Sequence, residues 1–286
     1  MITEILLPFF RSQDDKKKSF KFIYFCIFLI SIPCFSDGQQ QQDPLRLNGG
    51  SILAMSGENC VALAVDMRLG NGPQMVHTIP RTVLAPNSRV MVGFTGLEGD
   101  VQSFCSQLSV AMEDKIGRFG FFAGDETYDV DNEQHRFNIS PKSTSRLISH
   151  LLYGRRNSRP FYVEPITVGL EAVINVESND DNENAEFPND KESTRQYKPF
   201  LCSHDIIGAK STSDSFVCSG AASKSLYGTA EALWRPGLQP EELAQVCGKA
   251  FLSALERDCL SGYGAVVYLV IGGVGITQYD LACRND

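Results

Sequence analysis

The chain has 286 residues, of which 43% are hydrophobic and 21% charged. This length allows one large globular domain or two small ones, and the apolar content suffices for a sizeable core, which excludes a wholly disordered chain. No short repeat dominates the sequence, so collagen-like and coiled-coil folds are excluded as well. The formal net charge of −8 argues against broad electrostatic binding to nucleic acid.

Two short stretches carry the negative charge. Residues 177–192 have a net charge of −6 and residues 125–133 a net charge of −5, and removing both from the total of −8 leaves the rest of the chain at +3. Both are poor in apolar residues and rich in Asp and Asn, so we interpret them as solvated insertions covering about 121–137 and 177–195. Neither stretch has the glycine turn and closing Glu of a calcium-binding loop.

The first 47 residues form a separate extension. Four lysines between 16 and 21 precede a 14-residue apolar run, Phe22–Phe35, and small residues follow it, as in a secretory signal. The run contains Pro33 and is too short for a membrane-spanning helix. Two interpretations stay open: a disposable, disordered leader, or an upstream segment wrongly joined to the true start.

Apolar runs separated by turn residues predict the first strands of the main domain. These strands cover 51–55, 60–66, 82–85 and 90–95, as two pairs around the turn signals 56–59 and 86–88. Apolar residues at three- and four-residue spacing then predict two helices, over 97–112 and 144–153.

The second half of the domain repeats this order. Strands are predicted at 162–170, 172–176, 200–203, 205–208 and 215–218, which places the insertion at 177–192 at a hairpin tip. Helices over 221–233 and 240–254 follow, and Pro240 with two glutamates suits the first turn of the second one. The last strands, 264–271 and 276–281, flank the tight turn Gly272–Gly275.

The order of these elements predicts the architecture. Strands joined by short turns imply antiparallel sheets, and the helix pairs between them are suited to the outer faces. We therefore expect an α+β fold, a single four-layer αββα sandwich.

The cysteines and histidines indicate no metal site. Nine cysteines, at 26, 34, 60, 105, 202, 218, 247, 259 and 283, contain no Cys-x-x-Cys pair, and the four histidines share no ligand spacing. Several cysteines fall within apolar periodic segments, which predicts buried reduced thiols and favours an intracellular protein. We expect no cofactor.

Several separated segments carry a family resemblance. NGGSILAMSGENCVALAVDMRLG, VGFTGLEGDVQ, FVCSGAASKSLYG and ERDCLSGYGAVVYLV resemble, in this order, segments of the β subunits of the proteasome core particle. The start Asn48-Gly49-Gly50 and the Tyr-x-Glu-Pro element at 162–165 are most similar to the β type-3 group. The resemblance covers 48–286 and implies the αββα fold of N-terminal nucleophile hydrolases.

Active members of that family use an exposed N-terminal threonine as nucleophile, helped by a nearby lysine and by backbone N–H groups around the oxyanion. In this sequence the nucleophile position falls on Gly50, the lysine position on Thr82 and the oxyanion glycine on Gly96. The remaining site positions match the family and are Asp66 with Arg68, Ser219, Asp258 and Ser261. Because nucleophile and lysine are both missing, the resemblance implies an inactive subunit.

Two alternatives to this interpretation are left open. Cleavage after Gly50 would expose Ser51 as an N-terminal nucleophile, although Ser51 lies one residue late and the lysine is still missing. The second alternative is that the signal-like residues 1–36 direct the chain to secretion or to a membrane.

The resemblance also implies partners. Subunits of this kind assemble with other α and β subunits in stacked seven-membered rings. The resemblance also allows assembly chaperones as partners. It implies a role in ubiquitin-dependent protein degradation, without nucleic acid or membrane as a partner. It also implies a location in cytoplasm and nucleus, with which the signal-like segment at 16–36 conflicts. In some family members, carbonyl groups of the loop that matches 258–261 hold a structural cation. The sequence of this chain does not by itself require such a cation.

Overall fold

The computed structural model describes residues 50–71, 74–78, 83–119, 139–173 and 196–283. The extension at 1–47, both acidic insertions and Thr82 lie outside these residues. None of the described helices is long and apolar enough to cross a membrane.

Two antiparallel five-stranded sheets form the centre of the domain. The first sheet has the order β10-β1-β2-β11-β12, with β1 Ser51–Ser56, β2 Cys60–Asp66, β10 Phe216–Gly220, β11 Ala265–Ile271 and β12 Gly275–Leu281. The second sheet has the order β5-β6-β7-β8-β9, with β5 Val83–Asn87, β6 Val90–Gly96, β7 Val163–Val173, β8 Gln196–His204 and β9 Lys210–Ser213. A separate two-stranded sheet consists of β3 Arg68–Asn71 and β4 Gln74–Thr78.

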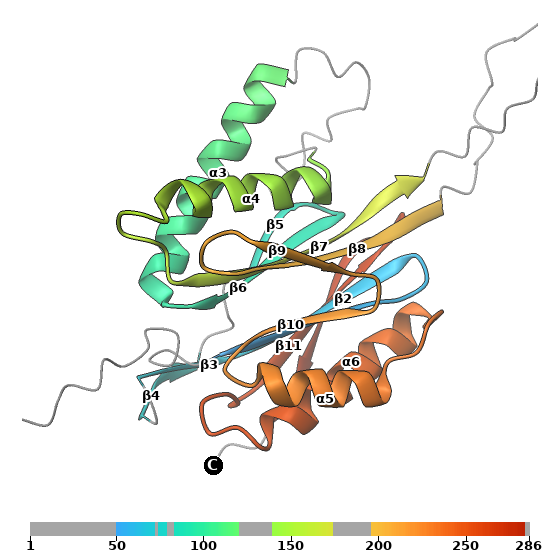
Figure 1. Ribbon diagram of the computed structural model, residues 1–286. Helices are drawn as coiled ribbons and strands as arrows, with labels where there is room; N and C mark the ends of the chain where they lie inside the picture. Colours follow the sequence, from blue (N-terminus) through green and yellow to red (C-terminus); the bar gives the residue numbers. More distant parts are fainter. Residues whose placement is uncertain (1–49, 72–73, 79–82, 120–138, 174–195, 284–286) are drawn as a thin grey trace, which may run out of the picture. The chain divides into compact units, whose positions relative to one another are not determined.

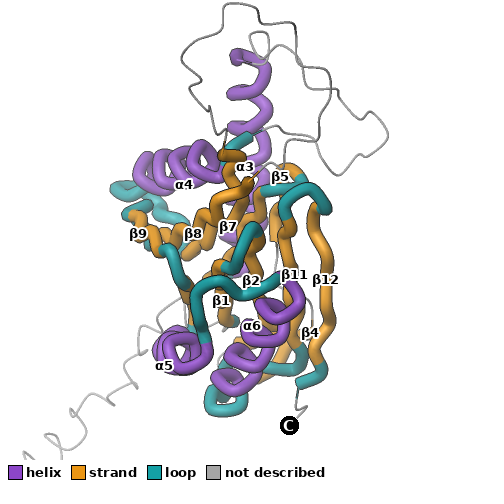
Figure 2. Tube along the Cα trace, turned by 90° about the vertical axis from the view of Figure 1, so that its right-hand side faces the viewer, coloured by secondary structure: helices purple, strands orange, loops and turns teal. Residues whose placement is uncertain are grey.

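Helix pairs cover the outer faces of the two large sheets. The helices are α3 Glu98–Phe119, α4 Pro141–Arg155, α5 Ser223–Leu233 and α6 Pro240–Leu255. Figure 1 shows α3 and α4 on one side of the sheets and α5 and α6 on the other, and Figure 2 shows the same layers from the side. The predicted four-layer αββα sandwich is therefore confirmed.

Three apolar clusters hold the four layers together. One lies between the first sheet and α5 with α6, around Leu53 and Phe251. The second fills the space between the two sheets, where Ile52 and Val168 are fully buried. The third joins the second sheet to α3 and α4 around Phe104. The strands β1 and β2 are buried along their whole length because apolar residues cover both of their faces.

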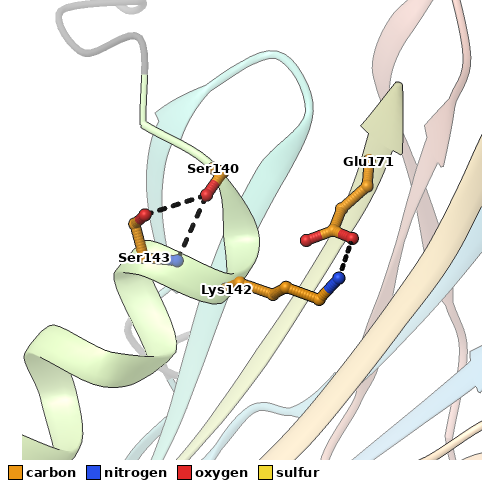
Figure 3. A network of polar contacts seen from close by, with 4 residues as sticks. All are labelled: Ser140, Lys142, Ser143 and Glu171. Atoms are coloured by element: carbon orange, nitrogen blue, oxygen red, sulfur yellow. Dashed lines mark hydrogen bonds and ion pairs between the residues drawn. The ribbon is translucent and has the colours of Figure 1, made fainter. Parts of the chain in front are cut away.

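The start of α4 is fixed by polar contacts (Figure 3). Ser140 is the N-cap: its Oγ accepts a hydrogen bond from the backbone N–H of Ser143 at 3.2 Å. Lys142 in the first turn forms an ion pair with Glu171 of β7, with 2.5 Å between Nζ and Oε2. Pro141 follows the cap at N1, where its missing N–H costs nothing. The helix therefore begins three residues earlier than the apolar periodicity predicts.

The prediction of two strands at 162–170 and 172–176 is wrong, because one continuous strand, β7, runs from Val163 to Val173. It pairs with β8 through to Val173 and Gln196, so residues 174–195 do connect the two strands of a hairpin, as expected for the insertion. The turn predicted at 86–88 begins two residues later, because Pro86 and Asn87 belong to β5 and Ser88-Arg89 form the turn.

The strand predicted at 205–208 is a turn. One carboxylate oxygen of Asp205, Oδ1, accepts hydrogen bonds from the N–H groups of Ile207 and Ala209 at 3.0 and 2.8 Å, which closes the chain on itself. The apolar isoleucine pair at 206–207 is the feature that favours a strand in the sequence. Three strands were missed, β3 and β4 around residues 72–73 and the short polar β9.

Candidate functional site

The structure brings most of the predicted site positions to one end of the two large sheets. Gly50 immediately precedes β1 and Ser51 opens it, while Asp66 closes β2, Gly96 closes β6 and Ser219 lies near the end of β10. Asp258 and Ser261 belong to the connection between α6 and β11. Direct contacts link this connection to β1, and β10 to β6, as described below. Thr82 lies outside the described residues.

The first polar network runs from β1 to the 258–261 connection. The hydroxyl oxygens of Ser51 and Ser261 are 2.8 Å apart, and the Ser261 hydroxyl donates to Oδ2 of Asp258 at 2.7 Å. The backbone N–H of Ala222 donates to Ser51 Oγ at 2.9 Å. Ser51 is fully buried, and its hydroxyl is engaged by the Ser261 hydroxyl and by the Ala222 N–H.

Backbone contacts fix the peptide unit that joins Gly50 to Ser51. The N–H of Gly50 donates to the carbonyl of Leu260 at 3.3 Å, and the carbonyl of Gly50 accepts from the N–H of Ala221 at 2.9 Å. The same Leu260 carbonyl accepts from Nη1 of the almost fully buried Arg68 at 2.9 Å. Gly50, the position predicted for the nucleophile, thus lies just before β1 with a φ of +91°, and both of its backbone polar groups are bonded to neighbouring segments.

A second polar network connects the two sheets. The Ser219 hydroxyl donates to Oε2 of Glu164 at 2.8 Å and lies 2.8 Å from the hydroxyl of Thr95. Ser219 is in β10 of the first sheet, whereas Thr95 and Glu164 are in β6 and β7 of the second. The predicted site residue Ser219 is therefore part of a link between sheets. The roles of Glu164 and Thr95 were missed, although a glutamate within an otherwise apolar strand was the available signal.

Gly96 is required by its backbone. Its φ is +115°, and an added Cβ would lie 2.2 Å from the carbonyl oxygen of Tyr162. The neighbouring Leu97 N–H donates to that same carbonyl at 2.9 Å. The close approach of these two chain segments therefore excludes any side chain at 96.

A cavity of about 130 Å³ lies beside the first network. Its lining includes Asp258, Ser261, Glu256, Tyr263 and Cys283. It is smaller than the roughly 300–1,000 Å³ of sites that take drug-sized ligands. Burial raises the pKa of the Cys283 thiol from its ordinary value, so the thiol is a poor nucleophile at neutral pH.

The remaining thiols are consistent with the predicted buried, reduced cysteines. Among the residues that the structure describes, seven cysteines are free, and four of these are buried, namely Cys60, Cys202, Cys218 and Cys247. Burial raises the pKa of Cys60, Cys105 and Cys218 to about 12, which keeps them protonated and unreactive. Within the described ranges, no three His, Cys, Asp or Glu side chains are grouped so as to hold a metal ion.

Comparison with known proteins identifies the family. A family model described as proteasome subunit matches residues 47–120 and 193–270. The chain is 34% identical to "Proteasome subunit beta type-3" of Picea mariana over 223 residues, which is 78% of this chain and 90% of that relative. It is 30% identical to the protein of the same name from Drosophila melanogaster over 242 residues, 85% of this chain and 98% of the relative.

A further relative of the same name, from Trypanosoma brucei brucei, is 34% identical over 226 residues, 79% of this chain and 91% of its own length. Spruce, insect and trypanosome relatives thus match across nearly the whole domain. From Gly50 on, the segments that carried the resemblance fall within the described αββα sandwich and supply its central strands and site loops. On the sequence match and the fold together, the chain belongs to the proteasome subunit family.

Proposed function

We propose that this chain is a non-catalytic β subunit of the proteasome core particle. In this role it occupies one position in a seven-membered β ring, contacts other α and β subunits and forms part of the wall of the proteolytic chamber. Its contribution to ubiquitin-dependent protein degradation is then structural: it holds the catalytic neighbours in place. The relatives named proteasome subunit β type-3 support this assignment.

Gly50 is the observation that carries the proposal. Glycine has no side-chain oxygen or sulfur to attack a peptide carbonyl, and the Gly50 carbonyl and N–H are both bonded to neighbouring segments. The lysine position, Thr82, has a side chain that carries no positive charge at neutral pH. Neither the nucleophile nor the electrostatic help that the family's chemistry needs is therefore supplied by these residues.

The buried environment of Ser51 argues against an N-terminal serine nucleophile. A free nucleophile needs an accessible hydroxyl with a base positioned to take its proton. The Ser51 hydroxyl is fully buried, accepts from Ala222 N–H and lies against Ser261. Cleavage after Gly50 would also separate Ser51 from Gly50, whose carbonyl and N–H bond to Ala221 and Leu260.

The other site positions have structural roles in this proposal. Asp258 and Ser261 brace the start of β1 through Ser51, and Ser219 joins the two sheets through Glu164. Gly96 allows the end of β6 to lie against the Tyr162 backbone, and Asp66 is fully buried at the end of β2. Because the networks are made of buried or half-buried groups, they stabilise the fold whether or not any chemistry takes place.

The proposal includes a domain start near residue 48 and an action in cytoplasm and nucleus. The family match beginning at residue 47 supports the domain boundary. The free, buried thiols support a reducing compartment. The same proposal takes residues 1–47 as a leader or an artefact, since the family match begins only at residue 47.

A covalent probe tests catalytic inertness. The assembled particle, purified through a C-terminal tag on this chain, is incubated with a fluorescent peptide whose electrophile reacts with N-terminal hydroxyl nucleophiles. We expect labelling of other subunits and none of this chain. Intact mass spectrometry is expected to show no amino terminus at Gly50 or Ser51.

The matched control is the Ser51→Ala variant, which removes the one hydroxyl that cleavage after Gly50 would expose. Under the proposal this variant and the wild type give the same labelling pattern. A band of this chain that is labelled in the wild type and absent in Ser51→Ala, with a mature start at Ser51, would overturn it.

A further inference from the structure

A small polar cluster is buried between α4 and the second sheet. It consists of Ser145 from α4 with Cys202 and His204 from β8, and we refer to these three residues as the His204 cluster. Their side chains are 1%, 0% and 4% exposed, in an interface where α4 otherwise presents apolar residues such as Ile148 and Leu152. A buried titratable side chain in an apolar interface needs a hydrogen-bond partner on each polar atom.

Both ring nitrogens of His204 face acceptors. Nδ1 is 3.2 Å from the carbonyl oxygen of Pro165 in β7. Nε2 is 3.1 Å from the carbonyl oxygen of Ser145 and 3.1 Å from the Ser145 hydroxyl. The hydroxyl itself lies 3.2 Å from the thiol sulfur of Cys202. Every partner that either protonation state needs is thus already within reach.

The neutral ring has one favourable tautomer. Pro165 offers only a carbonyl oxygen, so Nδ1 must carry the hydrogen that donates to it. The lone pair of Nε2 can then accept the hydrogen of the Ser145 hydroxyl. In this tautomer the Nε2 lone pair also lies 3.1 Å from the Ser145 carbonyl oxygen, but the Ser145 hydroxyl compensates by donating to Nε2. The opposite tautomer would set the Nδ1 lone pair against the Pro165 carbonyl, where the described contacts of Nδ1 include no donor. The Cys202 thiol can donate independently to the carbonyl of Ser203, 3.7 Å away.

We infer that the His204 cluster is a buried proton-binding site. One proton from solvent binds Nε2 of His204, the new N–H donates to the Ser145 carbonyl, and the Ser145 hydroxyl rotates to donate to the Cys202 sulfur. No covalent bond between heavy atoms forms or breaks, and only the hydroxyl hydrogen changes its direction. The domain can therefore take up a proton while His204 still bridges Ser145 of α4 and Pro165 of β7.

Burial and the neighbouring polar and charged groups set the pH at which this occurs. Burial is the main cause that lowers the pKa of His204, and the positive charge of Lys210 in β9 acts in the same direction. The hydrogen bonds to the Pro165 and Ser145 carbonyls and the carboxylate of Asp205 oppose it. Ser145 faces His204 from α4, and the Cys202 thiol faces it from β8. Burial raises the pKa of that thiol.

The effect on stability has a defined sign. An unfolded histidine has a pKa of about 6.5. The pKa of folded His204 is lower than this, so between the unfolded and the folded pKa the unfolded chain binds a proton that the folded chain does not. Protonation of His204 therefore costs stability as the pH falls below about 6.5, and His204→Gln, which cannot titrate, removes this dependence.

Nitrogen NMR of the labelled full chain tests the inference. Long-range proton–nitrogen spectra report the tautomer of each histidine, and the signals missing in His204→Gln assign those of His204. We expect the Nδ1–H tautomer at neutral pH and a titration midpoint below that of an ordinary histidine. Cys202→Ala removes the acceptor that the rotated hydroxyl needs in the protonated state, so the midpoint is expected to fall by about half a pH unit.

Two further variants make the test specific. Cys202→Ser keeps an acceptor and is expected to titrate like the wild type, whereas Cys218→Ala removes a buried thiol from the other sheet and is expected to leave the midpoint unchanged. Cys202→Val lacks the acceptor but retains volume, and it replaces Cys202→Ala if that variant unfolds. An Nε2–H tautomer at neutral pH, or a midpoint unchanged in both Cys202→Ala and Cys202→Val, would overturn the inference.

Discussion

Replacing Gly220 with alanine is expected to lower the free energy of unfolding by about 3–5 kcal/mol. The φ of Gly220 is +97°, and an added Cβ would lie 2.2 Å from the carbonyl oxygen of Gly50 and 2.9 Å from Cα of Ser51. Both obstacles are backbone atoms of the neighbouring strand, so no side-chain rotation relieves the clash. The substitution forces β1 away from β10 at the place where Ala221 N–H bonds to Gly50.

Urea titration of the purified chain, followed by circular dichroism, measures this effect. Gly228→Ala is the matched control, since a Cβ there meets nothing within 4 Å and the residue lies inside α5. We expect this control to be neutral or to raise stability by up to about 1 kcal/mol. Equal stabilities for Gly220→Ala and the wild type would show that β1 and β10 do not approach as closely as described.

Phe104→Ala is the second substitution with a large expected effect, a loss of about 3–5 kcal/mol in the free energy of unfolding. Phe104 in α3 is fully buried. Its ring makes edge contacts with Phe94 in β6 and with Phe161, at centroid distances of 6.0 and 5.4 Å. Truncation therefore removes one ring, two aromatic pairs and the centre of the cluster that holds α3 on the sheet.

Val110→Ala in the same helix is the control for Phe104→Ala. Val110 is 64% exposed, and alanine favours a helix, so stability is expected to change by no more than about 0.5 kcal/mol. The two variants are compared in the same urea titration. A loss of similar size in both would indicate a general weakness of α3 and would contradict the packing role given to Phe104.

Much of the fold follows from the sequence because its core elements are locally consistent. The apolar runs at 51–55 and 60–66 form β1 and β2, and the apolar spacing after Leu97 forms α3, since the local pattern and the buried environment agree there. The turn at 205–208 was missed because two isoleucines favour a strand, whereas one Asp205 oxygen, through two backbone hydrogen bonds, favours a turn.

The site was predictable only in part, because its contacts join residues far apart in the chain. Family resemblance gave Ser219 and Ser261, but the partners Glu164 and Thr95 lie 55 and 124 residues from Ser219. No local pattern encodes such pairs. The strands β3 and β4 were missed for a different reason: the described part of β4 is exposed at Met75 and Val76, so the apolar alternation that marks a half-buried strand is absent.

Assembly is the central claim, and co-purification tests it most directly. The full chain, carrying a C-terminal tag and expressed in its native cells at its normal level, is recovered under native conditions and separated by size. The proposal predicts that the chain elutes in a particle far larger than its own 31.5 kDa, together with other proteasome α and β subunits and in a fixed ratio to them. Recovery of the chain as a free monomer, with no proteasome subunits bound, would contradict it.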